Sequence, residues 1–178
     1  MSERSHAHPH AEAPDQHRAY APKSIRSAVL TVSDSRTEAT DSSGQLIQER
    51  LESAGHEVPD RLIVKDDPKA IRAAVLRQVS RPDIDAVIIT GGTGVSPRDV
   101  TPDTVEPMLE KVLTGFGELF RMLSFEEIGP AAVLSRALAG TVERTVIYVM
   151  PGSSGAVRLG MDRLILPEVA HVVGQLRR

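Results

Sequence analysis

The sequence predicts an α/β fold in which helices cover both faces of a mainly parallel sheet. Short apolar runs with strand character alternate with segments of helical periodicity, which is the pattern of repeated βαβ units. The strand runs are apolar at consecutive positions, as expected for strands buried on both faces. With 178 residues and no visible repeat or linker, the chain fits one domain of residues 25–178 preceded by a tail of residues 1–24.

The first two strands flank a clear helix. Residues 28–32 form an apolar run that ends in a polar segment, so we expect a buried strand followed by a loop. Ile47 and Leu51 follow with helical spacing, and Gly55 stands where a helix C-terminus favours glycine. Residues 61–64 are the second predicted strand.

A second helix and a third strand come next. Asp67 and Pro68 provide an N-cap and a proline at the first helical position. The apolar stripe of this helix consists of Ile71, Val75 and Val79. Pro82 ends the helix, and residues 85–90 predict a third strand that leads into a glycine-rich loop.

The remaining elements are less regular. Thr101 and Pro102 predict another N-cap and helix start, and Pro107 keeps that helix short or kinked because proline removes a backbone donor. A helix containing all three phenylalanines follows, and residues 133–138 are predicted to be weakly helical. Residues 144–150 predict the last strand. A break and a final helical region follow, which Pro167 is expected to interrupt.

Composition argues against several classes of function. The net charge is −3 without a clear basic patch, so we expect no nucleic-acid partner. The absence of cysteine excludes disulfides, thiolate zinc sites and a cysteine nucleophile. Because the apolar runs are too short to cross a bilayer and no signal peptide is visible, we expect a cytoplasmic protein without a membrane partner.

The segment 1–24 is interpreted as a disordered tail, because it combines three prolines with no apolar periodicity. His6, His8 and His10 alternate within it and are metal ligands in principle. We favour a segment without a metal site, since a flexible tail holds no fixed coordination geometry.

Three predicted strands end in small, polar or glycine-rich loops at residues 33–36, 91–94 and 152–155. In open parallel sheets, ligands bind beyond the carboxyl ends of the strands. Those ends share one edge of the sheet, so we expect the three loops to lie together and to form a binding site.

The loop after residues 85–90 is the richest of the three. Its glycines permit positive φ and close approach of the backbone to a ligand. Its amides, with the Thr93 and Ser96 hydroxyls, suit a phosphate group. No lysine follows a glycine as a P-loop requires, and Pro97 stands where a dinucleotide fingerprint needs its third glycine. The sequence therefore argues against a P-loop NTPase or a Rossmann dehydrogenase.

Two acidic residues are the candidates for a magnesium site. Asp67 has a structural role as an N-cap, so Asp66 is the better functional candidate, the alternative being an exposed loop acid. Asp99 is expected at the same edge of the sheet. The two carboxylates would share Mg²⁺ with phosphate oxygens.

The phenylalanine segment, residues 116–125, is interpreted as core or subunit interface. Glu118 and Arg121 are an i, i+3 pair within it, whose ordinary interpretation is a surface ion pair worth about 0.2–0.5 kcal/mol. His56 and His171 are interpreted as isolated surface residues.

These motifs resemble a known family. Residues 90–94 (TGGTG) and 98–102 (RDVTP) together resemble the signature of the molybdenum cofactor biosynthesis family that includes protein B and the Mog-type proteins. Residues 31–36 and 151–153 resemble its other loops, and residues 116–125 resemble the protein B branch in particular. The resemblance extends over the whole predicted domain.

The resemblance implies a three-layer α-β-α sandwich, the Mog-like molybdopterin-binding fold, assembled as a homo-trimer or hexamer. In active members, Mg²⁺-ATP adenylylates the terminal phosphate of molybdopterin and pyrophosphate leaves. Carried over to this sequence, Asp66 and Asp99 become the catalytic and metal-binding acids. Family members often have Pro-Asp at the first position, whereas this chain has Lys65-Asp66-Asp67, so Asp67 remains an alternative.

The loops and the resemblance together give a set of ligand-binding and phosphate-binding candidates. They are Ser33, Asp34, Ser35, Arg36, Thr90, Gly91, Gly92, Thr93, Gly94, Ser96, Thr101, Glu118, Arg121, Pro151, Gly152, Ser153, Ser154 and Gly155.

Three hypotheses follow. The first is a molybdopterin adenylyltransferase, which needs positioning and charge neutralisation rather than a covalent nucleophile. The second is a molybdopterin-binding or carrier protein without catalysis. The third is a scaffold that contacts other enzymes of the cofactor pathway through the phenylalanine segment, so that changing Phe120 disrupts assembly and spares ligand binding.

Overall fold

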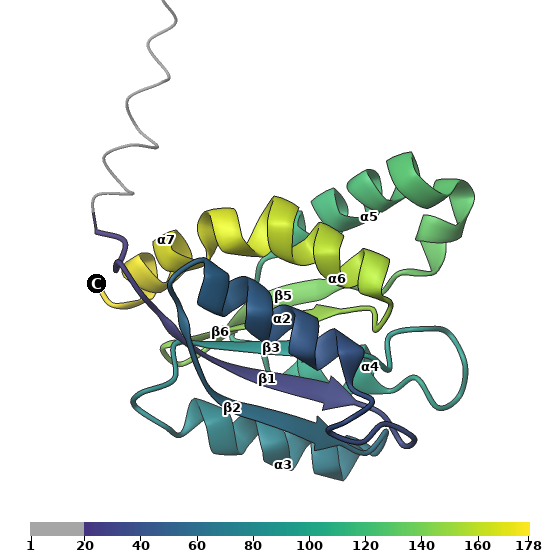
Figure 1. Cartoon of the computed structure of the whole chain (residues 1–178), viewed down its shortest axis with the longest axis horizontal. Coiled ribbons are helices and arrows are strands. Elements are labelled where there is room, and N and C mark those ends of the chain that lie inside the picture. Colours follow the sequence, from purple (N-terminus) through teal and green to yellow (C-terminus); the bar gives the residue numbers. More distant parts are fainter. Residues whose placement is uncertain (1–19) are drawn as a thin grey trace, which may run out of the picture.

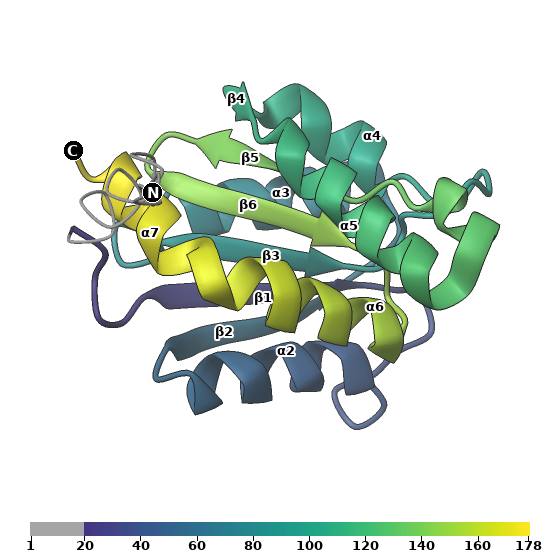
Figure 2. The same ribbon diagram turned by 90° about the horizontal axis from the view of Figure 1, so that it is seen from above.

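The computed structural model describes residues 20–178, which form a three-layer α-β-α sandwich around a six-stranded sheet (Figure 1, Figure 2). The strand order is β2-β1-β3-β6-β5-β4. The four parallel strands are β1 (Arg26–Val32), β2 (Glu57–Val64), β3 (Ala86–Thr90) and β6 (Thr145–Met150). The antiparallel edge consists of β5 (Leu138–Val142) and β4 (Lys111–Val112). The predicted fold class is therefore confirmed.

Helices cover both faces of this sheet. One face carries α2 (Ser42–Ser53), α5 (Thr114–Ile128), α6 (Ser154–Gly160) and α7 (Leu166–Leu176). The other carries α3 (Pro68–Val79) and the short α4 (Thr101–Val105). The 3₁₀ turns η1 (Glu106–Met108) and η2 (Gly129–Leu134) follow α4 and α5, and a π-helical turn, η3 (Met161–Ile165), joins α6 to α7.

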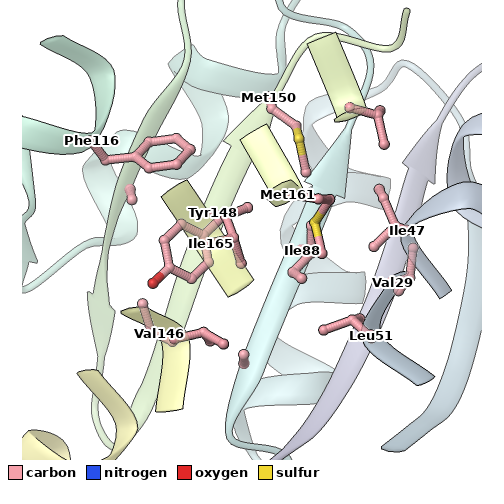
Figure 3. Close-up of a cluster of buried hydrophobic side chains, with 14 of the residues drawn as sticks. Val29, Ile47, Leu51, Ile88, Phe116, Val146, Tyr148, Met150, Met161 and Ile165 are labelled. Carbon is pink, nitrogen blue, oxygen red and sulfur yellow. The ribbon is translucent and has the colours of Figure 1, made fainter. Parts of the chain in front are cut away.

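Two hydrophobic clusters fill the spaces between the layers. Along β1, Val29 packs into one cluster, whereas Ala28 and Leu30 pack into the other. Figure 3 shows the first cluster, in which Ile47 and Met161 from the helices lie over the central strands. Because successive side chains of a strand point to opposite faces, burial on both faces requires the continuous apolar runs seen in the sequence.

Helix caps explain where α2 and α3 begin. The side chain of Asp67 accepts a hydrogen bond from the amide of Ala70 at 2.9 Å, as predicted. Asp41 caps α2 in the same way through the amide of Gly44. Gly55, at φ +83°, then turns the chain from α2 into β2.

Two sequence-based element assignments were wrong. Residues 133–138 are not a helix, because η2 ends at Leu134 and β5 begins at Leu138. Thr101 is the first residue of α4 and not its cap, since the cap position is Val100 and has no side-chain bond. The final helical region is interrupted next to Pro167, as expected, because the π-helical turn η3 separates α6 from α7 and Pro167 lies in the first turn of α7.

The start of the described chain lies against α7. The guanidinium of Arg178 is 4.0 Å from the ring centroid of Tyr20. The predicted tail, with His6, His8 and His10, otherwise lies outside the described residues. Within residues 20–178, no helix is both long enough and apolar enough to span a membrane.

The strand order contains a switch point between β1 and β3. After β1 the chain crosses through α2 to β2, which lies on one side of β1 in the sheet. After β3 the chain continues in the opposite direction, toward the edge formed by β5 and β4. Adjacent parallel strands whose connections diverge leave a crevice beyond their carboxyl ends, which is where ligands bind in open α/β sheets.

Candidate functional site

The loops that follow β1, β3 and β6 meet at this crevice, as the sequence predicts. The amide of Gly91 donates to Met150 O at 3.1 Å, and the Thr90 hydroxyl donates to Pro151 O at 3.1 Å. A β-carbon on Gly91, whose φ is +98°, would lie 2.4 Å from Val32 O at the end of β1. Only glycine therefore allows the loop after β3 to pass so close to β1.

Asp66, just beyond β2, directs its carboxylate at the glycine-rich loop. A β-carbon on Gly92 would lie 2.7 Å from Asp66 Oδ1 and 2.3 Å from Thr101 Oγ1. Both oxygens are buried and have no hydrogen-bond partner among the described residues. Burial, followed by the charges of Asp34 and Asp99, raises the pKa of Asp66. A carboxylate with one buried, unpartnered oxygen beside an unpartnered hydroxyl marks a place for a ligand group or a cation.

Asp99 has the opposite electrostatic setting. Its Oδ2 accepts hydrogen bonds from the Ser96 hydroxyl at 2.6 Å and from the Ser96 amide at 3.0 Å. The bond from the Ser96 hydroxyl is the main reason why the pKa of Asp99 is lowered, and the amides of Ser96 and Gly94 lower it further. Asp99 is therefore held as a carboxylate within its own loop.

A third acid, Asp34, connects the loop after β1 to the other two. Its carboxylate accepts a hydrogen bond from the guanidinium of Arg98 and, at 3.2 Å, one from the amide of Asp66. The bond from Arg98 is the main cause of the lowered pKa of Asp34. The Arg98 side chain is 75% exposed, so this ion pair adds little to stability and leaves the guanidinium accessible to an anion.

A cavity of about 410 Å³ lies beside these loops, within the range of small-ligand sites. One side of it is formed by the glycine-rich loop, Asp99 and residues 151–153. The opposite side is largely apolar and is formed by α5 and η2, including Phe120, Ile128 and Leu134. The cavity therefore offers polar backbone to one end of a ligand and apolar surface to the other.

Some candidates lie elsewhere. Glu118 and Arg121 line a second cavity, of about 520 Å³, and Arg121 donates to Ala137 O at 3.3 Å. The guanidinium of Arg36 donates to Thr40 O at 2.9 Å within its own loop. The structure therefore does not bring these three side chains to the glycine-rich loop.

The remaining candidates serve local structure around the crevice. The Ser33 hydroxyl accepts from the amides of Ser35 and Arg36, which shapes the loop after β1. The Ser153 hydroxyl caps α6 by accepting from the amide of Ala156 at 3.2 Å. Ser154 and Gly155 are the first residues of that helix.

The phenylalanines divide between core and surface. Phe116 and Phe120 are buried in the core, with exposed fractions of 9% and 1%. The interpretation as core is therefore confirmed for these two residues, and neither offers a surface to a partner. Phe125 is 59% exposed and is the phenylalanine that a partner can reach.

Sequence reasoning missed two residues that organise the site. Asp41 is buried and accepts hydrogen bonds from the Thr31 hydroxyl at 3.0 Å and from Arg61 at 3.1 Å. Its position ahead of a helical stripe is a capping signal that was available in the sequence. Arg136 donates to the carbonyl of Gly94 at 2.9 Å, and no local sequence pattern indicates such a contact.

Comparisons with known proteins identify the family of this chain. The family described as "Probable molybdopterin binding domain" matches residues 28–171. Molybdenum cofactor biosynthesis protein B of Bacillus cereus is 52% identical over 164 residues, which cover 92% of this chain and 97% of that protein. This chain belongs to the molybdenum cofactor biosynthesis protein B family.

Solved structures of protein B relatives share the fold. A crystal structure of molybdenum cofactor biosynthesis protein B superposes with a TM-score of 0.86 at 53% identity, covering 89% of this chain and 99% of that one. The tungsten cofactor synthesizing protein MoaB from Pyrococcus furiosus superposes with a TM-score of 0.80 at 39% identity, covering 89% and 100%. Family membership therefore rests on nearly the whole length of the relatives.

Proposed function

We propose that this chain binds molybdopterin and adenylylates its terminal phosphate with Mg²⁺-ATP. The observation that carries the proposal is the buried, unpartnered carboxylate oxygen of Asp66 beside Gly92 and Thr101, in the crevice that Asp99 also borders. Membership of a molybdenum cofactor biosynthesis family supplies the substrate class. The apolar side of the 410 Å³ cavity would receive the pterin end of the ligand, and the loops its phosphate.

The proposed reaction joins two anions. An oxygen of the terminal phosphate attacks the α-phosphorus of ATP, the bond from that phosphorus to the bridging oxygen breaks, and pyrophosphate leaves. No side chain needs to act as a nucleophile, so the residues must position the two phosphates and offset their charge. The amides of residues 91–94, the Thr101 hydroxyl and the Arg98 guanidinium are the groups available for this.

Asp66 is the residue best suited to hold Mg²⁺, which would neutralise phosphate charge when bound. Magnesium takes one or two protein carboxylates and completes its shell with water and phosphate oxygens. Such a site needs no larger cluster of ligands. In the described part of the chain, no group of three or more His, Cys, Asp or Glu side chains is arranged to hold a metal ion. Asp67 is engaged in capping α3, which favours Asp66.

A carrier without catalysis is the second candidate. Asp99 already accepts hydrogen bonds from both the hydroxyl and the amide of Ser96. If Asp99 keeps these bonds when ligand is bound, one acid alone faces the phosphates, and the chain binds molybdopterin without turning it over.

A direct assay separates the two. Purified protein is mixed with molybdopterin and Mg²⁺-ATP, and adenylylated molybdopterin and pyrophosphate are followed. We expect product from the wild type, a loss of roughly 100-fold in Asp66→Asn and Asp99→Asn, and full activity in Asp83→Asn. Asp83 is a matched control, because it pairs with Arg81 ahead of β3, at the opposite end of the strand. Tight binding without product would establish the carrier, and wild-type rates in both acid variants would refute the two-acid mechanism.

We further propose that the chain self-assembles, as a trimer or hexamer, through the outer face of α5 and η2. This face, called the α5 patch below, carries exposed apolar side chains, namely Leu119, Met122, Phe125, Ile128, Val133 and Leu134. Ile128 and Leu134 also line the site cavity, so a second subunit on this patch would help to close it. Other enzymes of the cofactor pathway are the alternative occupants.

A further inference from the structure

One guanidinium holds the backbone of the glycine-rich loop from outside. Arg136, between η2 and β5, donates from Nε to Gly94 O at 2.9 Å and to Thr93 O at 3.4 Å. Its terminal nitrogens donate to Asp99 O and, at 2.7 Å, to the carboxylate of Asp103. Three carbonyls of one loop therefore converge on a side chain that lies about forty residues further along the chain.

These contacts decide where the loop amides point. In a trans peptide, the carbonyl of one residue and the N–H of the next point in opposite directions. Drawing the Thr93 carbonyl toward Arg136 therefore turns the Gly94 amide away from it. That amide is one of the groups that lower the pKa of Asp99. Arg136 thus fixes Asp99 in two ways. It binds the carbonyl of Asp99 directly, and it orients the Gly94 amide that binds the carboxylate of Asp99.

Among the described residues, the other hydrogen bonds of residues 94–99 lie within the loop itself, apart from the exposed ion pair of Arg98 with Asp34. Val95 at its tip is 68% exposed, and Ser96, Pro97 and Arg98 are exposed too. Segments with few buried apolar contacts open locally at low free-energy cost. The hydrogen bonds from Arg136 are therefore a principal restraint on this segment.

We propose that Arg136 is the positioning residue of the glycine-rich loop, which holds Asp99 and the loop amides in register for adenylyl transfer. The catalytic part of this inference rests on the proposed function, whereas the restraint on the loop does not. A displacement of about 1 Å in a site built on positioning costs roughly 100-fold in rate.

The test compares Arg136→Gln, Arg136→Lys and the control Arg72→Gln, which changes an exposed arginine of α3. Hydrogen exchange of the backbone amides of Gly94, Ser96 and Asp99 is measured first, in the protein without substrate. We expect exchange to be about tenfold faster in Arg136→Gln, intermediate in Arg136→Lys, and unchanged in the control. Unchanged exchange in Arg136→Gln would overturn the proposal, whatever the function of the site.

The kinetic arm separates positioning from binding. We expect kcat of Arg136→Gln to fall by about tenfold or more while KM stays within about threefold, with partial rescue by lysine. A rise in exchange spread over the whole fold, or an unchanged kcat beside a loosened loop, would refute a positioning role. If the wild type forms no product, the proposed transferase fails, and the exchange measurement alone decides the role of Arg136.

Discussion

Gly92 lies directly against the carboxylate of Asp66. A β-carbon at position 92 would come within 2.7 Å of Asp66 Oδ1 and within 2.3 Å of Thr101 Oγ1, and the backbone there has φ +62°. The absence of a side chain at this position is therefore what allows the acid, the hydroxyl and the loop backbone to share one small volume.

Gly92→Ala should damage the site more than the fold. The added methyl group is strained at positive φ and displaces the two unpartnered oxygens, so we expect a stability loss of about 1–3 kcal/mol and a loss of roughly tenfold or more in molybdopterin affinity. Calorimetry and thermal unfolding measure both. Gly115→Ala is the control, because its β-carbon meets nothing within 4 Å and alanine favours the helix. Equal affinity in the two variants would contradict the assigned site.

Asp66→Asn should make the metal-free protein more stable at pH 7. Because the pKa of Asp66 is raised, the fold favours the protonated acid. The protonated acid therefore contributes stability that is fully present below the ordinary pKa of aspartate. This stability is lost as the pH rises through the pKa that Asp66 has in the folded protein. At pH 7 the ionised acid opposes folding, so its neutral isostere should raise the free energy of unfolding. Urea unfolding in EDTA measures the change.

Asp99→Asn should shift stability in the opposite direction under the same conditions. The pKa of Asp99 is lowered, so its ionised form supports the fold above the ordinary pKa. If both variants moved stability in the same direction, the opposite settings of the two acids would be wrong.

The sequence predicted the central parallel strands because their burial leaves a pattern. Residues 86–90 and 145–150 are buried at every position, so the apolar run is visible without any neighbour. The antiparallel edge leaves no such pattern. Lys111–Val112 is an exposed pair, and Gly140 of β5 weakens the strand signal. Both segments are strands because β4 pairs with β5 and β5 pairs with β6. No local sequence pattern encodes these pairings.

The arrangement of the candidate site was predictable where it follows strand ends. The glycine-rich loop and Asp66 belong to this part, since strand topology alone places them at one edge. Glu118 and Arg121 show the limit of motif transfer. Residues two apart on a helix do not share a face, so Phe120 borders the loop cavity while Glu118 borders the other one. Arg136 could not be predicted, because its contacts with distant carbonyls arise from the fold and leave no local pattern in the sequence.

Asp41→Ala should be far more destabilising than Asp67→Ala. Both acids cap helices of 12 residues. Asp41, however, has a fully buried side chain that also accepts from Thr31 and Arg61. Its loss leaves those donors without an acceptor, so we expect about 3 kcal/mol, against about 1 kcal/mol for the exposed cap of Asp67. Urea unfolding of both variants gives the comparison, and similar losses would show that the buried network contributes nothing beyond the cap.

His56 should make the fold sensitive to mild acid. Its Nδ1 is buried without a partner among the described residues, and burial lowers the pKa of the ring. The neutral ring supports the fold above pH 6.5, and this contribution is lost as pH falls through the folded pKa. The midpoint of thermal unfolding should therefore fall less in His56→Gln than in the wild type between pH 7.5 and about 5.5. Above pH 7.5 the difference between the two proteins should stay constant, and parallel curves at all pH values would exclude His56 as the source.

Phe125→Glu should separate subunits without unfolding them. Phe125 is 59% exposed in the centre of the α5 patch, whereas Phe120, five residues earlier, is buried in the core. A charge on an exposed helix position changes the stability of the monomer by roughly 0.5 kcal/mol or less. A charge buried without a partner at an apolar interface weakens association by several kcal/mol, by order of magnitude. Sedimentation should therefore show a smaller species for Phe125→Glu than for the wild type. Thermal unfolding should show that this smaller species is still folded. Glu126→Gln, on the same helix but outside the patch, should leave assembly unchanged. An oligomer that survives Phe125→Glu intact would place the subunit contact on another face and leave the α5 patch to a different partner.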